Sequence, residues 1–177
     1  MEGKENLVKT ILDNFCVKSG ILCSKCEEKL RRGLVTELDL KVIKILSELE
    51  KEHSILQDIS FHKSAEVGNT LAILVDKRDI GKMLGYGGKI LRAIGEKTGR
   101  RIKILGYGGD AREFLEELFN PFSILTINTI WLPDGSTETK VILSGRSPRR
   151  MPLDFDVIKK LAKDIRGLTL RIEFERA

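Results

Sequence analysis

The apolar positions after residue 36 recur every three or four residues, which is the spacing of one face of an α-helix. Thr36 and Asp39 have the spacing of a capping box, in which two side chains satisfy free N–H groups at a helix start. We therefore expect a helix from Thr36 to about His53. Its apolar face comprises Leu38, Val42, Ile45, Leu46 and Leu49.

Two short runs rich in apolar residues follow this helix, with Gly68 between them. Runs of this kind, separated by a glycine-containing break, predict two strands joined by a turn. A short apolar helix, a glycine turn, a longer helix ended by Gly99 and an alternating strand come next. The first unit is thus α-β-β-α-α-β, with its last five elements at Ile59–Ser64, Thr70–Asp76, Ile80–Leu84, Lys89–Thr98 and Arg101–Leu105.

The same order recurs in the second half of the chain, but without the short helix and the glycine turn. The sequence Pro133-Asp134-Gly135-Ser136 is a strong hairpin signal between two strands. We expect Trp131, on the strand before this turn, to lie in the core. The predicted elements are helix Ala111–Phe119, strands Phe122–Leu132 and Thr137–Ser144, a helix from Asp154 or Phe155 to Arg166, and strand Leu168–Glu175.

The first 35 residues have a different character. Leu7 to Leu12 predicts a short helix, and Glu27 to Arg32 is a charged stretch that Gly33 ends. The start of the chain is too polar for a signal peptide, and no apolar run reaches the roughly 18 residues of a membrane span. We expect a cytoplasmic protein without membrane contact, in which the three cysteines are reduced.

Composition limits the function only weakly. The 177 residues suffice for one medium or two small domains, and 41% hydrophobic content is ordinary for a folded protein. The net charge of +5 suits a nucleic-acid partner but does not require one, because 26 acidic residues accompany 31 basic ones. No set of His, Asp, Ser or Cys residues resembles a catalytic constellation, so we expect no enzyme activity.

The segment Gly85-Tyr86-Gly87-Gly88 is the most informative motif in the chain. Glycine lets the main chain approach a ligand closely, and the first-turn N–H groups of the following helix have no partner within that helix. The helix dipole there favours negative charge, and Lys82, Lys89 and Arg92 are nearby, so the expected ligand is a polyanion. A P-loop is excluded, because it would need Gly at position 83 and Ser or Thr at position 90. A second LGYGG string, at 105–109, is interpreted as a connector because an aspartate follows it and no lysine does.

This apolar turn, GxxG motif, helix and strand resemble the KH RNA-binding module, whose GxxG loop clamps the backbone of about four nucleotides. The helix and two strands before the motif resemble the type II form. Two such units joined by a helix look like the tandem KH region of the transcription factor NusA. The compact length and the cysteines are most similar to archaeal NusA-like proteins.

The resemblance implies single-stranded RNA binding without catalysis. It assigns the backbone clamp to Gly85, Tyr86, Gly87 and Gly88, and nearby positive charge to Lys82, Lys89 and Arg92. The apolar positions that form and support the nucleotide groove correspond to Ile80, Leu84, Ile90 and Ile94.

Two departures from the family pattern bear on function. The pair inside GxxG is Tyr86-Gly87, where the family often has Lys or Arg, although a tyrosine can stack on a base. In the second unit, Gly145 to Arg150 stands where GxxG belongs, and Pro148 and Pro152 disrupt a short helix there. Two interpretations of its three arginines, Arg146, Arg149 and Arg150, stay open: pairing with phosphates, or a solvated basic loop.

The cysteines form a candidate metal site. Cys23 and Cys26 have the spacing of a structural zinc chelate, and Cys16 is a third ligand. A closed site needs a fourth ligand, and Asp13 lies at the same spacing before Cys16 as Cys23 does before Cys26. His53 or His62 are alternatives for this fourth place. The competing interpretation is free thiols in a small helical hairpin.

We expect an α+β protein of two packed type II KH-like units behind a Cys-containing segment. The domains are 1–35, a candidate zinc knuckle; 36–109, a KH domain with GxxG; and 110–177, a degenerate KH-like domain. The expected function is single-stranded RNA binding in transcription elongation, transcription termination or RNA processing. The alternative is a KH-fold interaction module that docks on RNA polymerase or the ribosome. The sequence does not indicate an oligomeric state.

Overall fold

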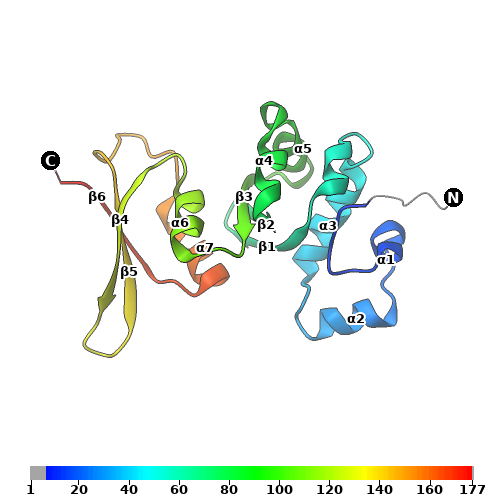
Figure 1. Cartoon of the computed structure of the whole chain (residues 1–177), viewed down its shortest axis with the longest axis horizontal. Coiled ribbons are helices and arrows are strands. Elements are labelled where there is room, and N and C mark those ends of the chain that lie inside the picture. Colours follow the sequence, from blue (N-terminus) through cyan, green and yellow to red (C-terminus); the bar gives the residue numbers. More distant parts are fainter. Residues whose placement is uncertain (1–6, 177) are drawn as a thin grey trace. The chain divides into compact units, whose positions relative to one another are not determined.

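The computed structural model describes residues 7–176 and divides the chain into two compact units (Figure 1). Unit 1 comprises Met1–Ser64 and Leu71–Gly108, and unit 2 comprises Ala65–Thr70 and Gly109–Ala177. Each unit has a three-stranded sheet and several helices, which confirms the expected α+β class. No helix within residues 7–176 has the length and apolar character needed to cross a membrane.

Unit 1 has the sheet order β1-β2-β3, with β2 in the centre. The core includes Leu46 of α3, Ile73 of β2 and Ile90 of α5, each at most 1% exposed. The expected capping box starts α3: the Asp39 N–H donates to Thr36 Oγ1, and the Thr36 N–H donates to Asp39 Oδ2. The elements are α1 Asn14–Ser19, α2 Ser24–Arg31, α3 Glu37–Leu49, η1 Ser54–Asp58, β1 Phe61–Val67, β2 Thr70–Asp76, η2 Lys77–Asp79, α4 Ile80–Leu84, η3 Tyr86–Gly88, α5 Lys89–Thr98 and β3 Arg101–Tyr107.

Unit 2 has the sheet order β4-β5-β6. β4 pairs antiparallel with β5, and β5 pairs parallel with β6, so Val141 lies between Ile127 and Ile172. A parallel pair needs a crossover connection, and α7 supplies it. The elements are α6 Ala111–Phe119, β4 Ile124–Trp131, β5 Thr137–Leu143, α7 Phe155–Arg166 and β6 Leu170–Phe174.

Four phenylalanine rings of unit 2 pack against one another beside its core. Phe155 of α7 stacks on Phe174 of β6 with ring centroids 5.9 Å apart, and Phe122 meets both rings edge-on. Phe119 of α6 also contacts Phe155 edge-on. Aromatic pairs in such geometries are stabilising beyond the area they bury. The rings therefore fix α6 and α7 on the sheet.

The expected helix at Leu7 to Leu12 is wrong. Lys9 instead forms a bridge parallel to Ser60, in which its N–H donates to Ile59 O and its carbonyl accepts from Phe61 N–H. Glu50 Oε2 accepts a hydrogen bond from the N–H of Val8, at 2.9 Å. These long-range partners satisfy the backbone and hold it extended.

Two further expectations need correction. The helix expected to reach about His53 ends at Leu49. A turn follows it, in which the His53 N–H donates to the carbonyl oxygen of Leu49. Trp131, expected in the core, is 76% exposed. It is the last residue of β4, which is an edge strand, and it pairs with Thr137 beside the hairpin turn.

Candidate nucleic-acid interface and cysteine cluster

The glycine turn has an unusual run of left-handed backbone. Gly85 ends α4 with φ −68° and ψ 178°, and a Cβ there would lie 3.2 Å from the carbonyl oxygen of Gly81. Tyr86, Gly87 and Gly88 follow with φ values of 56°, 66° and 72°. Glycine adopts this region without steric cost, whereas a tyrosine does so at some strain. The turn therefore depends on its glycines for its shape.

This turn leaves the start of α5 without a side-chain cap. Gly88 occupies the N-cap position and has no side chain to accept from the first-turn N–H groups. Three other helices of the protein have such caps: Thr36 caps α3, Asp110 caps α6 and Asp154 caps α7. Free N–H groups at the positive end of the helix dipole form a ready anion site.

The three cations named from the sequence differ in their partners. The guanidinium Nη2 of Arg92 donates to the carbonyl oxygen of Gly87 at 3.1 Å, so this side chain braces the turn from outside. Its remaining N–H groups can still meet an anion. Lys89 is exposed, and within residues 7–176 its ammonium has neither a hydrogen bond nor an ion pair. Lys89 is therefore the cation most available to a phosphate.

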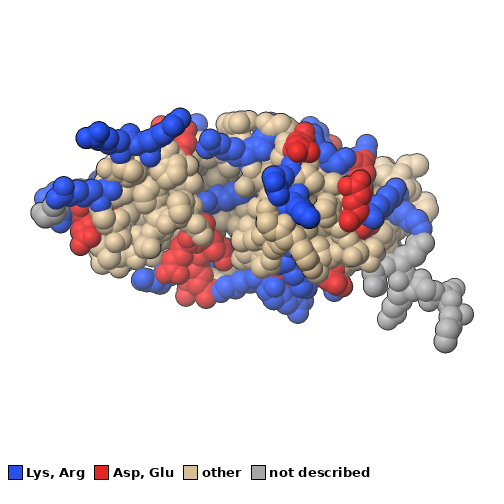
Figure 2. All heavy atoms as spheres, turned by 90° about the horizontal axis from the view of Figure 1, so that it is seen from above, with Lys and Arg blue, Asp and Glu red and all other residues tan. Residues whose placement is uncertain are grey.

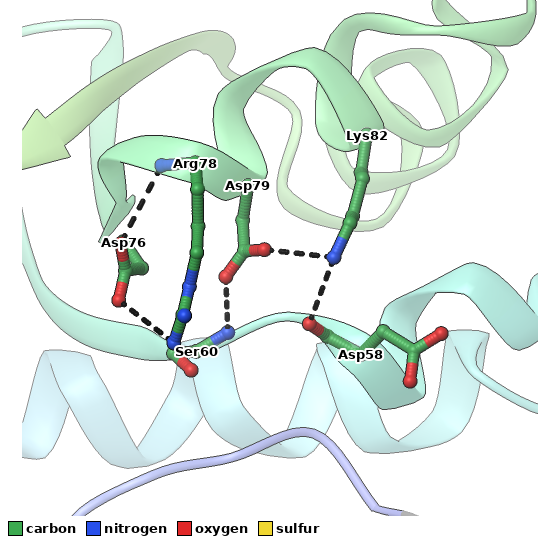
Figure 3. A network of polar contacts seen from close by, with 6 residues as sticks. All are labelled: Asp58, Ser60, Asp76, Arg78, Asp79 and Lys82. Atoms are coloured by element: carbon green, nitrogen blue, oxygen red, sulfur yellow. Dashed lines mark hydrogen bonds and ion pairs between the residues drawn. The ribbon is translucent and has the colours of Figure 1, made fainter.

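Lys82 is engaged by a buried carboxylate that sequence reasoning missed. Its ammonium donates to Asp79 Oδ1 at 3.0 Å and to the carbonyl oxygen of Asp58 at 3.4 Å (Figure 3). Asp79, which is only 1% exposed, also accepts from the Ser60 N–H through Oδ2 at 2.9 Å. The only signal in the sequence is the spacing of Asp79 and Lys82, three residues apart at a helix start.

Burial alone would raise the pKa of the Asp79 carboxyl. The hydrogen bonds from the Ser60 N–H and the Lys82 ammonium, together with the positive charges of Lys82 and Arg78, outweigh burial and leave this pKa below its ordinary value. Asp79 is therefore ionised at neutral pH, and Lys82 neutralises it. Figure 3 shows the Arg78 side chain turned toward Asp76, with which it forms an exposed ion pair at 3.5 Å.

The apolar residues assigned to the nucleotide groove separate into two groups. Leu84 is 49% exposed and Tyr86 is 71% exposed, so both can contact a ligand. Ile90 and Ile94 are each 1% exposed and belong to the core of unit 1. Ile90, named from the sequence as a binding residue, therefore lies in the core at the start of α5, where it supports the turn. Ile80 is half-buried beside this core.

The four residues predicted as metal ligands come together. The ligand atoms of Asp13, Cys16, Cys23 and Cys26 all lie within 4.8 Å of one another. The Cys23 thiol donates to Asp13 Oδ2 at 3.3 Å, and the Cys23 N–H donates to Cys16 Sγ at 3.2 Å. Neither His53 nor His62 is part of this group, and the His62 ring instead stacks on Tyr107 at 4.2 Å.

The environment of the sulfur atoms differs within this cluster. Burial raises the pKa of the Cys26 thiol to about 11. The pKa of the Cys23 thiol is lowered chiefly by a hydrogen bond with the Cys26 backbone and, to a smaller extent, by one with the Cys16 side chain. N–H groups directed at sulfur orient a thiolate ligand and stabilise its charge. Three sulfurs and one carboxylate at this separation suit a tetrahedral zinc ion.

Basic and acidic side chains are mixed over the surface in Figure 2, so no face seen there is of a single sign. One segment of unit 2 nevertheless lacks acidic residues. Gly145 to Leu153, between β5 and α7, contains three exposed arginines and no carboxylate. The overall distribution of charge therefore does not identify an anion-binding surface, whereas the local sequence marks Gly145 to Leu153 as a positively charged segment.

Comparisons with known proteins connect the glycine turn to a family. A family model of the KH domain matches residues 70–150, which are less than half of the chain. A relative described as "Probable transcription termination protein NusA", from Methanocaldococcus jannaschii, is 29% identical over 62 residues, which are 35% of this chain and 32% of the relative. The match thus spans about a third of that protein's length. A solved structure titled "Crystal structure of APE1850" aligns with a TM-score of 0.49 and 18% identity, over 72% of this chain and 94% of that chain. The glycine turn lies inside the segment that matches the KH domain.

Proposed function

We propose that this protein binds single-stranded RNA through the glycine turn of unit 1. The observation that carries the proposal is the uncapped start of α5, where Gly87 and Gly88 leave free N–H groups beside an exposed lysine. This is a site for a phosphate of a nucleic-acid backbone. The KH match over the same residues supports RNA as the ligand.

The roles within the site follow from exposure and partners. Gly85 to Gly88 form the backbone clamp, and Lys89 supplies the side-chain charge. Tyr86 and Leu84 offer exposed apolar surface to a base, because an aromatic ring stacks on any base. Arg92 holds the turn and retains donors for a phosphate. Lys82 contributes chiefly through its contact with Asp79.

We place this binding in a NusA-like role, in transcription elongation or termination or in RNA processing. The weak likeness to an archaeal protein described as a transcription termination factor supports this assignment. The proposed domains are a Cys-containing segment at 1–35, a KH domain at 36–109 and a second KH-like domain without GxxG at 110–177. The element order α6-β4-β5-α7-β6 supports the second domain, because it repeats unit 1 except for the short helix and turn.

A second function has its own support. No cation lies inside the turn, where the pair is Tyr86-Gly87, and Lys82 is already paired. Both observations favour a KH-fold module that docks on RNA polymerase or the ribosome and binds RNA weakly. RNA titration of the purified protein separates the two functions.

We also propose a structural zinc ion held by Asp13, Cys16, Cys23 and Cys26. Their proximity and the N–H···S hydrogen bond between Cys23 and Cys16 support a chelating arrangement. The ion would tie the start of α1 to the start of α2, since Asp13 and Cys16 come from the first and Cys23 and Cys26 from the second. Elemental analysis of the purified protein tests this: one zinc per chain is expected. Absence of zinc, with three freely titrating thiols, would reject it.

The RNA site is tested by replacing Gly87 and Gly88 with Asp. Asp tolerates left-handed backbone better than most residues. A Cβ at either position would also have space, because no heavy atom lies within 4 Å of it other than those of its chain neighbours and its own helix backbone. Two carboxylates at the clamp should repel phosphate and abolish binding of a short RNA of about six nucleotides.

The matched control is the double Asn variant, which has the same shape without charge. It should fold equally and retain more RNA affinity than the Asp variant. Fluorescence anisotropy measures binding, and circular dichroism checks the fold. Unchanged affinity in a folded Asp variant would remove the glycine turn from the RNA site.

A further inference from the structure

The segment Gly145–Arg150 of unit 2, here called the arginine loop, carries three exposed guanidinium groups. Within residues 7–176, Arg146, Arg149 and Arg150 have no hydrogen bond or ion pair through their side chains. Glu175 does contact the loop, but its Oε2 accepts from the backbone N–H of Gly145, at 3.3 Å. Several other surface arginines of this protein do pair with acids, as Arg112 does with Glu116 at 2.9 Å. The arginine loop is a local excess of positive charge.

The arginine loop occupies the same place in the order of elements as the glycine turn. In unit 1 the chain passes from β2 to its neighbour β3 through α4, the glycine turn and α5. In unit 2 it passes from β5 to its neighbour β6 through the arginine loop and α7. Both segments therefore lead from a central strand into the crossover helix of their unit.

The chemistry at these two equivalent places differs. Asp154 caps α7, with its Oδ1 accepting from the N–H groups of Asp156 and Val157 at 3.0 and 3.4 Å. The start of α7 is therefore closed to an anion, unlike that of α5. Any anion here must be held by side chains. Guanidinium groups suit this task, because their planar donors bind phosphate in pairs.

We propose that the arginine loop is a second RNA-binding site, which contacts backbone phosphates through its three side chains and without base specificity. The inference rests on the proposed RNA-binding function of unit 1. Of the two interpretations left open by the sequence, it chooses pairing with phosphates over a solvated basic loop. Because it acts through charge, the site adds affinity for longer RNA and makes binding more sensitive to salt.

The expected size follows from counterion release. Each phosphate neutralised on a single strand contributes about 0.7 to the slope of log K against log salt, so three contribute about 2. Between roughly 50 and 200 mM salt, this term alone lowers affinity about 20-fold. Replacing all three arginines by Gln should therefore reduce the slope by about 2.

The test uses the full chain with the clamp disabled by Gly87→Asp and Gly88→Asp. Oligouridine of about 20 nucleotides, longer than one KH clamp requires, is titrated at several salt concentrations. This background should still bind, with a slope near −2. Adding R146Q, R149Q and R150Q should remove that binding. Adding R146K, R149K and R150K instead should preserve the slope, because the charge is kept.

Three results would overturn the proposal. The first is equal binding by the Gln variant and its parent, and the second is equal loss in the Gln and Lys variants. The third is polyglutamate of similar charge binding as tightly as the RNA, which would indicate an acidic protein partner. Failure of the wild-type chain to bind any RNA would instead reject the function proposed for unit 1. Circular dichroism confirms that each variant is folded.

Discussion

Lys89 should account for more of the salt-sensitive RNA binding at the glycine turn than Lys82, although both flank it. Lys89 is exposed, and within residues 7–176 its ammonium has no partner. Lys82 is held 3.0 Å from the buried carboxylate of Asp79. Lys89→Gln and Lys82→Gln remove the same charge from the same region. Comparing them therefore separates a phosphate contact from an internal ion pair.

The two substitutions should affect different quantities: Lys89→Gln the salt slope of RNA binding, and Lys82→Gln the free energy of unfolding. Lys89→Gln should reduce the salt slope for a short RNA by about 0.7, the contribution of one phosphate, which makes binding about 2.5-fold less salt-sensitive between roughly 50 and 200 mM. Lys82→Gln should change the slope by less than about half as much. It should instead lower the free energy of unfolding by about 1 kcal/mol. This is below the value for a hydrogen bond to a buried charge, since solvent screens a side chain that is 37% exposed.

Fluorescence anisotropy with a labelled RNA at four or more salt concentrations gives the slopes, and thermal unfolding followed by circular dichroism gives the stabilities. A change of 1 kcal/mol should shift the unfolding midpoint of unit 1, which has about 100 residues, by about 4 °C. If Lys82→Gln lowers the slope as much as Lys89→Gln does, Lys82 contacts phosphate and the reasoning from its ion pair is wrong. An unchanged slope in Lys89→Gln would also refute it.

Two further predictions concern stability. Asp79→Asn should lower the free energy of unfolding by about 1–3 kcal/mol at neutral pH. Because the pKa of Asp79 is lowered in the folded protein, the stability that its carboxylate contributes is present above about pH 4 and is lost as the pH falls through the folded-state pKa. Urea unfolding of the wild type and of Asp79→Asn at several pH values measures this loss. A stability difference between the two proteins that is as large in acid as at neutral pH would contradict the prediction. A zinc chelator should lower the unfolding temperature of the wild-type protein but not that of Cys23→Ser, which lacks a ligand; equal melting of the wild type with and without chelator would argue against a structural ion.

Three helices, α4, α5 and α6, were predictable from local signals. α4, α5 and α6 begin and end at the residues expected from the sequence. Gly85 and Gly99 end α4 and α5, and an Asp110 capping box starts α6. These signals act within a few residues, so they do not depend on contacts with distant parts of the chain. Strand ends were predicted less well, because pairing with distant residues sets them.

The errors arose where distant contacts decide the structure. The spacing of Leu7 and Leu12 suits a helix, but the backbone of Lys9 pairs with residues about fifty positions along the chain. An aromatic residue in a strand is usually buried, yet Trp131 lies at the end of an edge strand. Neither outcome can be read from neighbouring residues.

The candidate site shows the same division. The sequence identified three cations near the turn, but not that Asp79 would be buried and bind one of them. Proximity along the chain is enough to predict a local charge. It does not reveal which charges are already neutralised, because Ser60 and Asp58, which complete the network, come from a segment some twenty residues earlier.

Tyr86 explains how a turn without a cation can still suit an RNA backbone. Left-handed φ at a tyrosine costs on the order of 1 kcal/mol, and such strain persists only where surrounding contacts hold it. Here the bond from Arg92 to Gly87 O and the helix that starts at Lys89 hold the turn on both sides. The strained backbone leaves the ring 71% exposed and the N–H groups of α5 uncapped. In the proposed site the turn itself would therefore act through its main chain and its aromatic ring, with Lys89 beside it as the exposed cation. Further charge for longer RNA would come from outside the turn, and the arginine loop is the candidate.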